Sequence, residues 1–218
     1  MRVSKRVPTN TAASPLHLGT ISRILLRMQN TDTHNQLNNW HDESLLPSAV
    51  LSGMQREWLT NPDSLTQRLL HFTDQKIEFS LVQQGHGNAL DDEAALLGIS
   101  TDQTVWTRDI IWGYQNTPWV CGHATIPEDT LAGEGIALKD IADKSIGTIL
   151  FSDPDLQRDP LQFSQIDPTH PFLSHLKPQH MTPSLNLWAR RSRFFCFGKP
   201  LIITEIYLPT LFQWLNSL

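Results

Sequence analysis

Cysteine and basic residues are scarce in this sequence, and their scarcity excludes several classes of protein. Only Cys121 and Cys196 occur among the 218 residues. They are too few and too far apart for a zinc site or a disulfide framework. This cysteine usage is typical of a reducing compartment, so we expect a cytoplasmic protein. The formal net charge of −5 gives no electrostatic case for binding nucleic acid.

Long hydrophobic runs and the common catalytic motifs are also missing. No apolar run approaches the roughly 20 residues that a membrane-spanning helix requires. The sequence has no P-loop, no G-x-G-x-x-G, no G-x-S-x-G and no H-E-x-x-H. Three histidines, His170, His175 and His180, fall in a proline-rich stretch without a predicted helix or strand to bring them together. We therefore expect no metal site.

The N-terminal region differs in composition from the rest of the chain. It is basic and rich in Ser and Thr, with no acidic residue before Asp32. This composition resembles a transit peptide. The alternatives are a flexible basic arm or a later start at Met28, and we favour these. We expect residues 1–46 to form a flexible extension and residues 47–218 to form one domain with a proline-rich insertion at 152–184.

The hydrophobic pattern of the domain predicts an α+β fold. A helix is expected to open at Pro47 and Ser48, and a second helix has Ser64 and Gln67 as its capping box. Other elements are expected as strands at 76–84, 103–114 and 118–126, short helices at 91–97 and 138–142, and a hairpin at 187–209. Because tight turns join successive strands, we expect a single antiparallel β-sheet with helices packed on one side.

Two charged residues occupy otherwise apolar strand faces. Glu205 alternates with Leu201, Ile203 and Tyr207 in the second arm of the hairpin, whose turn is expected at Gly198-Lys199-Pro200. An unpaired charge on such a face is expensive to bury. Glu205 therefore either forms a structural ion pair with an arginine of the first arm, Arg191 or Arg193 in the simplest case, or serves a ligand. Arg108 is the corresponding lone charge on one face of the strand at 103–114, in a row with Trp106, Ile110 and Trp112.

These two charges and two helix starts suggest a kind of ligand. Arg108 and the backbone N–H groups at the helix starts, Leu65 and Ile146, suit a carboxylate. Glu205 suits a hydroxyl group or a proton transfer. The combination indicates a dry pocket for a small, ring-shaped hydroxy acid.

The hairpin run LWARRSRFFCFGKPLIITEIYLP resembles the signature hairpin of the chorismate pyruvate-lyase family, whose members make 4-hydroxybenzoate for ubiquinone. Three earlier runs fall in the family's order and at compatible spacing: EWLTNPDSLTQRL, VWTRDIIWGYQNTPWVCGHATIP and IGTILFSDPDLQRD. The resemblance covers residues 51–209. It implies a chorismate-lyase-like fold and a monomeric enzyme that converts chorismate to 4-hydroxybenzoate and pyruvate without a metal or organic cofactor.

The resemblance also implies roles for individual residues. Arg108 matches the arginine that grips the ring carboxylate, and Leu65 and Ile146 match positions whose backbone N–H groups assist it. Glu205 matches the carboxylate that meets the ring hydroxyl, either as the base or as an orienting group. In the run GHATIP, His123 stands where the family has arginine, beside the region expected to hold the enolpyruvyl carboxylate.

Two other functions stay open at this point. The effector-binding domains of some bacterial transcription regulators resemble the lyase fold but bind small ligands without turning them over. A lyase-like enzyme with a different substrate is the other alternative, and His123 is the residue that suggests it. Release of pyruvate from chorismate distinguishes a lyase from both.

Overall fold

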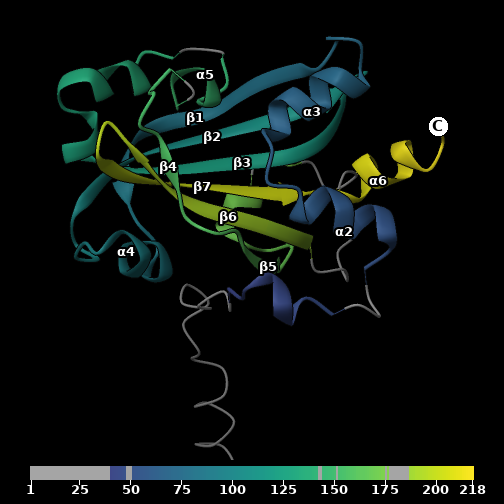
Figure 1. Ribbon diagram of the computed structural model, residues 1–218, viewed down its shortest axis with the longest axis horizontal. Coiled ribbons are helices and arrows are strands. Elements are labelled where there is room, and N and C mark those ends of the chain that lie inside the picture. The colour runs from purple at the N-terminus through teal and green to yellow at the C-terminus, as the bar shows by residue number, and fades with distance from the viewer. Residues whose placement is uncertain (1–39, 48–50, 142–143, 151, 175, 177–186) are drawn as a thin grey trace, which may run out of the picture. The chain divides into compact units, whose positions relative to one another are not determined.

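One antiparallel β-sheet organises the part of the chain that the structure describes (Figure 1). The computed structural model describes residues 40–47, 51–141, 144–150, 152–174, 176 and 187–218. Within them the strand order is β1-β2-β3-β7-β6-β4, and β5 also pairs with β6. The strands are β1 (Glu78–Asn88), β2 (Thr104–Tyr114), β3 (Thr117–Pro127), β4 (Gln157–Arg158), β5 (Gln162–Ile166), β6 (Leu187–Cys196) and β7 (Lys199–Tyr207). The predicted α+β class with a single antiparallel sheet is confirmed.

Helices lie against both faces of this sheet, whereas the sequence predicted them on one side only. They are α2 (Gly53–Thr60), α3 (Leu65–Phe72), α4 (Asp91–Leu97), α5 (Gly147–Leu150) and α6 (Pro209–Leu215), with 3₁₀ turns at η1 (Glu43–Leu45), η2 (Glu128–Leu131), η3 (Gly133–Leu138) and η4 (Pro171–Leu173). Helices α2 and α3 cover the face that carries Trp112 and Tyr207. Helix α4 lies on the opposite face, where its Glu93 accepts a hydrogen bond from Thr125. None of the helices in the described ranges is long and apolar enough to cross a membrane.

Serine side chains fix where α2 and α3 begin. Ser52 and Gln55 form a reciprocal capping box at the start of α2. Helix α2 therefore begins at Gly53 rather than at the predicted Pro47 and Ser48, and residues 48–50 lie outside the described ranges. The predicted N-cap of α3 is confirmed at Ser64, whose hydroxyl accepts from the Gln67 backbone N–H at 3.4 Å. The reciprocal hydrogen bond of a capping box, from the Ser64 backbone N–H to the Gln67 side chain, is not formed at this helix.

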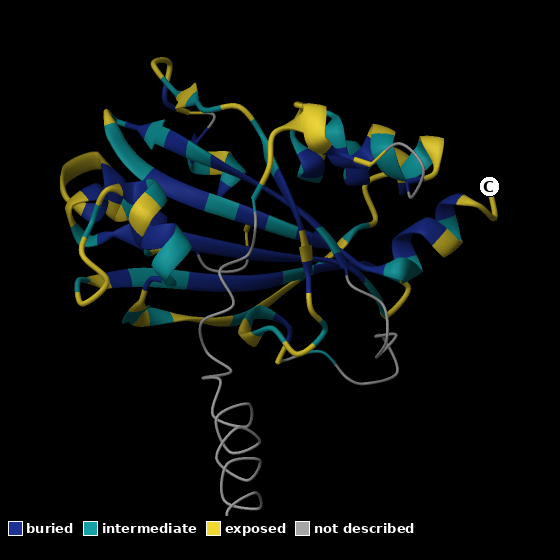
Figure 2. Ribbon diagram, turned by 90° about the horizontal axis from the view of Figure 1, so that it is seen from below, coloured by how far each residue is buried: buried dark blue, intermediate teal, exposed yellow. Residues whose placement is uncertain are grey.

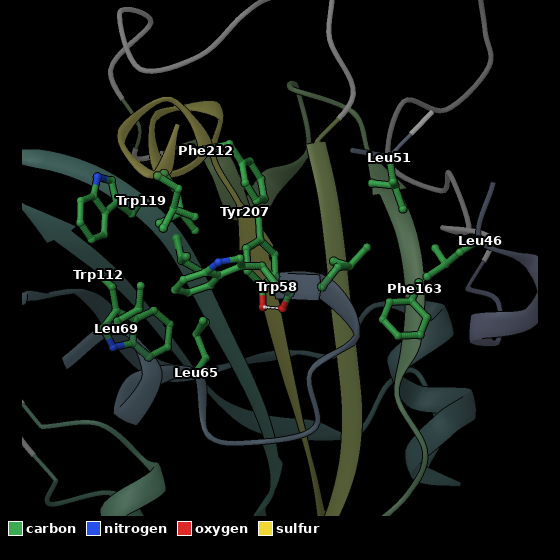
Figure 3. Packing of buried hydrophobic residues seen from close by; sticks show 14 of the residues in the cluster. Leu46, Leu51, Trp58, Leu65, Leu69, Trp112, Trp119, Phe163, Tyr207 and Phe212 are labelled. Atoms are coloured by element: carbon green, nitrogen blue, oxygen red, sulfur yellow. Dashed lines mark hydrogen bonds between the residues drawn. The ribbon is translucent and has the colours of Figure 1, made fainter. Parts of the chain in front are cut away.

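The main core lies between α2, α3 and the sheet. Its large side chains include Trp58, Leu65, Trp112 and Tyr207, which converge in Figure 3. The Tyr207 hydroxyl donates to the Trp58 carbonyl at 3.2 Å, so the polar end of this buried ring has a partner. Figure 2 shows that the central strands are buried along most of their length, while exposed residues concentrate in turns and on the outer sides of helices.

Strand alternation sets two rows of residues back to back. On the α2/α3 face, the row across β2, β3, β7 and β6 is Ile110, Gly122, Glu205 and Arg190. One residue away on each strand, the row on the α4 face is Asp109, His123, Thr204 and Arg191. Neighbouring residues of a strand point to opposite faces, so these two rows face different surroundings.

Four sequence expectations need correction. The short helix expected at 138–142 is replaced by the 3₁₀ turn η3, which ends at Leu138, and residue 142 lies outside the described ranges. Strand β1 spans Glu78–Asn88 and so continues beyond residue 84, where the predicted strand ended. The stretch 152–184 was expected to be irregular, yet β4, β5 and η4 lie in it and β4 and β5 extend the sheet beside β6. The hairpin turn lies at Phe197-Gly198, not at 198–200. Both turn residues have positive φ, 51° and 74°, as a two-residue hairpin turn requires.

The predicted boundary at residue 46 stays a prediction. Residues 1–39 lie outside the described ranges. Within the described ranges, His41 pairs with Phe163 of β5, and the Trp40 indole donates to Asp92 at 2.7 Å.

Candidate active site

A cavity of about 740 Å³ lies between the starts of α3 and α5 and strands β4, β6 and β7. This volume falls within the range typical of small-molecule sites, roughly 300–1,000 Å³. Polar, charged and apolar residues all line the cavity. The lining residues include Leu65, Ile146, Arg158, Arg190, Ser192 and Glu205.

The two helix starts predicted from the sequence meet at this cavity. Leu65 is the first residue of α3, and Ile146 directly precedes α5. The hydroxyl groups of Thr66 and Ser145 are hydrogen-bonded at 3.1 Å, which ties the two starts together. Backbone N–H groups at such positions have no acceptor within their own helix and are available to an anion.

Glu205 is paired with Arg190, not with Arg191 or Arg193. Arg190 Nε donates to Glu205 Oε2 at 2.5 Å, and its Nη1 donates to the backbone carbonyls of Leu59 and Asn61. The correction follows from the turn. A loop at 198–200 sets Glu205 opposite Arg193, whereas the two-residue turn at 197–198 sets it opposite Arg190. Arg191 and Arg193 point to the other face, where they bond Asp92 and Asp159.

The Arg190–Glu205 pair leaves part of the carboxylate open to the cavity. Burial lowers the pKa of Arg190, but attraction to Glu205 outweighs it and the net pKa is raised, so the pair is ionic. The Glu205 side chain retains 14% of its exposure and lines the cavity. Its second oxygen, Oε1, accepts no hydrogen bond from the residues that the structure describes. A ligand hydroxyl can therefore donate to it without displacing Arg190.

Gly122 leaves space for the Trp112 ring beside Glu205. It is the β3 residue opposite Glu205, and a Cβ atom there would lie 2.6 Å from the Trp112 ring and 2.9 Å from Ile110. Trp112 itself lines the cavity. A side chain at position 122 would therefore have to displace the ring that forms this wall.

Arg108 lies on the cavity face but not among the lining residues. It is buried, and it donates to Gln84 Oε1 at 2.5 Å and to the Lys144 carbonyl at 3.0 Å. Lys144 directly precedes the lining residues Ser145 and Ile146. The predicted carboxylate anchor thus lies behind the segment that forms one wall of the cavity.

His123 lies on the opposite face of the sheet, away from this cavity. Gly122 is opposite Glu205, so alternation turns the next residue, His123, towards α4 and η4. Its ring is hydrogen-bonded to Asp109 and, at 2.9 Å, to Thr125, and it stacks on Phe172 with ring centroids 3.8 Å apart. Burial disfavours the charged imidazole, but Glu93, Asp109 and Asp92 outweigh this effect, so the pKa of His123 is raised.

The lining residues that were not singled out from the sequence include Arg190, Ser192 and Arg158. No role was predicted for Arg190, because its pairing with Glu205 depends on the hairpin register. Ser192 carried no signal. Arg158 lies in a two-residue strand, which is too short for a period of two to be recognised.

Comparison with known proteins gives one family. The model of the chorismate lyase family matches residues 37–216. A probable chorismate pyruvate-lyase of Coxiella burnetii is 38% identical over 173 residues, covering 79% of this chain and 92% of the relative. A probable chorismate pyruvate-lyase of Nitrosospira multiformis is 32% identical, covering 82% and 97%. The chorismate pyruvate-lyase of an Enterobacter species is 29% identical, covering 73% and 86%.

A solved transcriptional regulator of the GntR family from Bacillus cereus covers 62% of this chain and 93% of its own, at 16% identity and a TM-score of 0.48. This similarity is too low to support a conclusion about the present protein. The family model and the curated relatives both span most of the chain. The chain belongs to the chorismate lyase family.

Proposed function

We propose that the protein is a chorismate pyruvate-lyase whose chemistry takes place in the cavity beside Glu205. The carboxylate of Glu205 supports this most directly. One of its oxygens is held by Arg190 and the other faces a cavity that two helix starts also line. This arrangement suits a ring with a hydroxyl group at one end and a carboxylate at the other. Chorismate and 4-hydroxybenzoate both have these groups.

The reaction is an elimination. The hydrogen at C4 of the ring leaves as a proton, and its bonding electrons form the C3–C4 double bond. The C3–O bond breaks, and its electrons stay on the oxygen of the departing enolpyruvate, which takes up a proton to become pyruvate. The ring becomes aromatic and keeps its C4 hydroxyl, giving 4-hydroxybenzoate. Aromatisation supplies the thermodynamic drive, so the protein mainly has to orient and polarise the substrate.

In this proposal Glu205 accepts a hydrogen bond from the C4 hydroxyl through Oε1. That contact fixes the ring beside the bonds that change. A carboxylate that accepts this hydrogen bond is adjacent to C4, so we propose Glu205 as a candidate for the base that removes the proton, and Gln and Ala variants separate the two roles. Arg190 holds the carboxylate in place without occupying the oxygen that faces the cavity.

Arg108 anchors the ring carboxylate together with the N–H groups of Leu65 and Ile146. Arg108 now donates to the Lys144 carbonyl, and this carbonyl belongs to the segment that leads into Ile146. A ligand carboxylate placed at Ile146 would take over that hydrogen bond. The exchange replaces a neutral acceptor by a charged one, which makes a stronger hydrogen bond to guanidinium.

The elimination needs neither oxidant nor reductant, so we propose that no cofactor takes part. The product makes this the first step toward ubiquinone. We also propose a monomer in the cytoplasm. The two cysteines are buried and free in the structure, in keeping with a reducing compartment.

Incubation with chorismate tests this function. Purified protein should release 4-hydroxybenzoate and pyruvate in equal amounts, followed by the absorbance of the aromatic ring and by a coupled assay for pyruvate. The rate should be unchanged after treatment with a chelator. Tight binding of 4-hydroxybenzoate without release of pyruvate would show a ligand-binding protein instead.

A further inference from the structure

Arg158 differs from Arg190 and Arg191, the arginines of the neighbouring strand β6 that lie near it at the cavity. Arg190 is paired with Glu205, and Arg191 is paired with Asp92. Arg158 donates from Nε to the Ser192 hydroxyl at 3.0 Å and from Nη1 to the Pro62 carbonyl at 2.5 Å. Both acceptors are neutral. Among the residues that the structure describes, Arg158 forms no ion pair, and its Nη2 makes no hydrogen bond.

The surroundings hold the Arg158 guanidinium in place beside the site. Its charged group lies over the Phe194 ring at 5.0 Å from the centroid, while Ser192 and Pro62 fix two of its nitrogens. Side chains fixed in this way lose little further freedom when an anion binds. Arg158 therefore adds an ordered positive charge to a cavity in which the Arg190–Glu205 pair is already neutral overall.

The strand order places this charge on a particular side of Glu205. Arg108 is on β2, Glu205 is on β7 and Arg158 is on β4, so Glu205 lies between the two arginines along the sheet. In chorismate the C4 hydroxyl lies across the ring from the ring carboxylate and next to the enolpyruvyl ether at C3. With the hydroxyl at Glu205 and the ring carboxylate towards Arg108, the enolpyruvyl group points away from Arg108.

We propose that Arg158 binds the enolpyruvyl carboxylate of chorismate and keeps hold of it as pyruvate forms. This inference rests on the function proposed above, and it assigns to Arg158 the contact that the sequence resemblance suggested for His123. When the C3–O bond breaks, negative charge develops on the ether oxygen next to this carboxylate. A guanidinium at that end stabilises the departing enolpyruvate as well as the bound substrate.

Comparing two ligands isolates this contact. 4-Hydroxybenzoate lacks the enolpyruvyl group, so its affinity should not depend on Arg158. In Arg158→Gln we expect the KM for chorismate to rise roughly 10- to 100-fold, as for a lost charge-assisted hydrogen bond, while the Kd of 4-hydroxybenzoate changes less than about twofold. Arg158→Lys keeps the charge and should recover part of the loss. Inhibition by added pyruvate should weaken in Arg158→Gln.

Arg193→Gln is the matched control. Arg193 is on the neighbouring strand β6, stacks on Phe195 and is paired with Asp159, but it points to the opposite face. Its loss should leave the KM for chorismate unchanged. Parallel weakening of chorismate and 4-hydroxybenzoate in Arg158→Gln would overturn the proposal, because it would indicate a structural role or a contact with the ring carboxylate. Unchanged values for both ligands would overturn it too.

The wild-type protein separates this inference from the function on which it rests. If the wild type releases no pyruvate from chorismate, the lyase function fails. If the wild type is active and the two ligands respond alike to Arg158→Gln, only the assignment of Arg158 fails. Should Arg158→Gln not fold, Arg158→Lys allows the same comparison, with a smaller rise in KM for chorismate expected and equal changes for both ligands counting against the proposal.

Discussion

Two clusters of buried polar residues lie on opposite faces of strands β2, β3, β6 and β7. On the α4 face, His123, Asp109 and Glu93 form a closed network. Both ring nitrogens of His123 are bonded, and Gln83 and Thr125 supply further contacts. All four oxygens of the two carboxylates accept a hydrogen bond, the last from the Leu90 backbone N–H. On the cavity face, Glu205 Oε1 and Arg158 Nη2 have no such partner among the described residues.

Exposure follows the same division. The side chains of His123, Asp109 and Glu93 retain 7%, 7% and 3% of their exposure, against 14% for Glu205. A buried charge whose hydrogen-bonding atoms are all used inside the protein is held for structure. A charge with one atom held and one facing a cavity is prepared for a ligand. The type of residue alone does not distinguish these cases.

Substitution of Glu205 should have the largest effect on activity. Glu205→Gln keeps the shape and can still hydrogen-bond a hydroxyl, but it cannot take up a proton. If Glu205 is the base, kcat should fall by roughly 10²–10⁴-fold in Glu205→Gln with 4-hydroxybenzoate binding kept. If it only orients the hydroxyl, Glu205→Gln should stay active and Glu205→Ala should be clearly slower.

A thermal melt of each Glu205 variant provides the control. Removing the carboxylate leaves Arg190 buried without its partner, so some loss of stability is expected in both variants. Activity must therefore be expressed per folded molecule. Full activity per folded molecule in Glu205→Ala would remove this residue from the site. Glu205 would then have a structural role, like the His123 network on the α4 face.

Arg108→Ala should come next, with its main effect on ligand affinity. Losing a charge-assisted contact in a dry site costs about 2–4 kcal/mol of binding free energy. Calorimetry with 4-hydroxybenzoate measures this loss, and a melt measures the accompanying loss of stability from the Gln84 and Lys144 contacts. Unchanged affinity together with a lower melting temperature would show that Arg108 is a structural cation and that the ring carboxylate binds elsewhere.

His123→Gln should affect stability and leave catalysis intact. The folded-state pKa of His123 is raised above the unfolded value of about 6.5. Its stabilisation is therefore fully present below the unfolded pKa and is lost as pH rises through the folded pKa. We expect the difference in unfolding free energy between wild type and His123→Gln, about 1–3 kcal/mol at pH 6, to shrink as the pH rises through the folded-state pKa. Denaturant titrations at several pH values measure it.

The KM of His123→Gln is the informative control. If His123 has no contact with substrate, the KM for chorismate at pH 7 should stay within about twofold of the wild type. A KM that rises with no change in 4-hydroxybenzoate affinity would return the enolpyruvyl carboxylate to the α4 face and contradict the assignment of Arg158.

The sequence predicts features within a single strand or helix better than it predicts how strands pair with one another. Alternation within a strand was enough to place Glu205 with Tyr207 and Arg108 with Trp112, and capping chemistry located the start of α3. The partner of Glu205 was not predictable, because a turn at 197–198 in place of 198–200 shifts the pairing by three residues and exchanges Arg193 for Arg190. The face of His123 relative to Glu205 depends on how β3 and β7 pair, which neither strand specifies alone.

Strand β4 shows a different limit. Its two residues pair with Phe194 and Phe195 on β6, and no local pattern of that length distinguishes a strand from a loop. Arg158 lies at the cavity because β4 pairs with the edge of β6. The segment around Arg158 is rich in proline, which is typical of irregular structure. The sequence therefore gave no indication that Arg158 lies in a strand.

Tyr207→Phe should have the smallest effect and gives the finest test of the comparison. Tyr207 shares the face of Glu205, yet its hydroxyl is buried and donates to the Trp58 carbonyl, so it belongs with the closed network rather than the open site. Removing the hydroxyl leaves that carbonyl without its donor, at a cost of about 1 kcal/mol. For a domain of this size the melting temperature should fall by roughly 2–4 °C. Because no polar atom open to the cavity is lost, kcat and the KM for chorismate should match the wild type. A clear loss of kcat without a change in melting temperature would mean that sharing a face with Glu205 is itself enough to involve a residue in the chemistry.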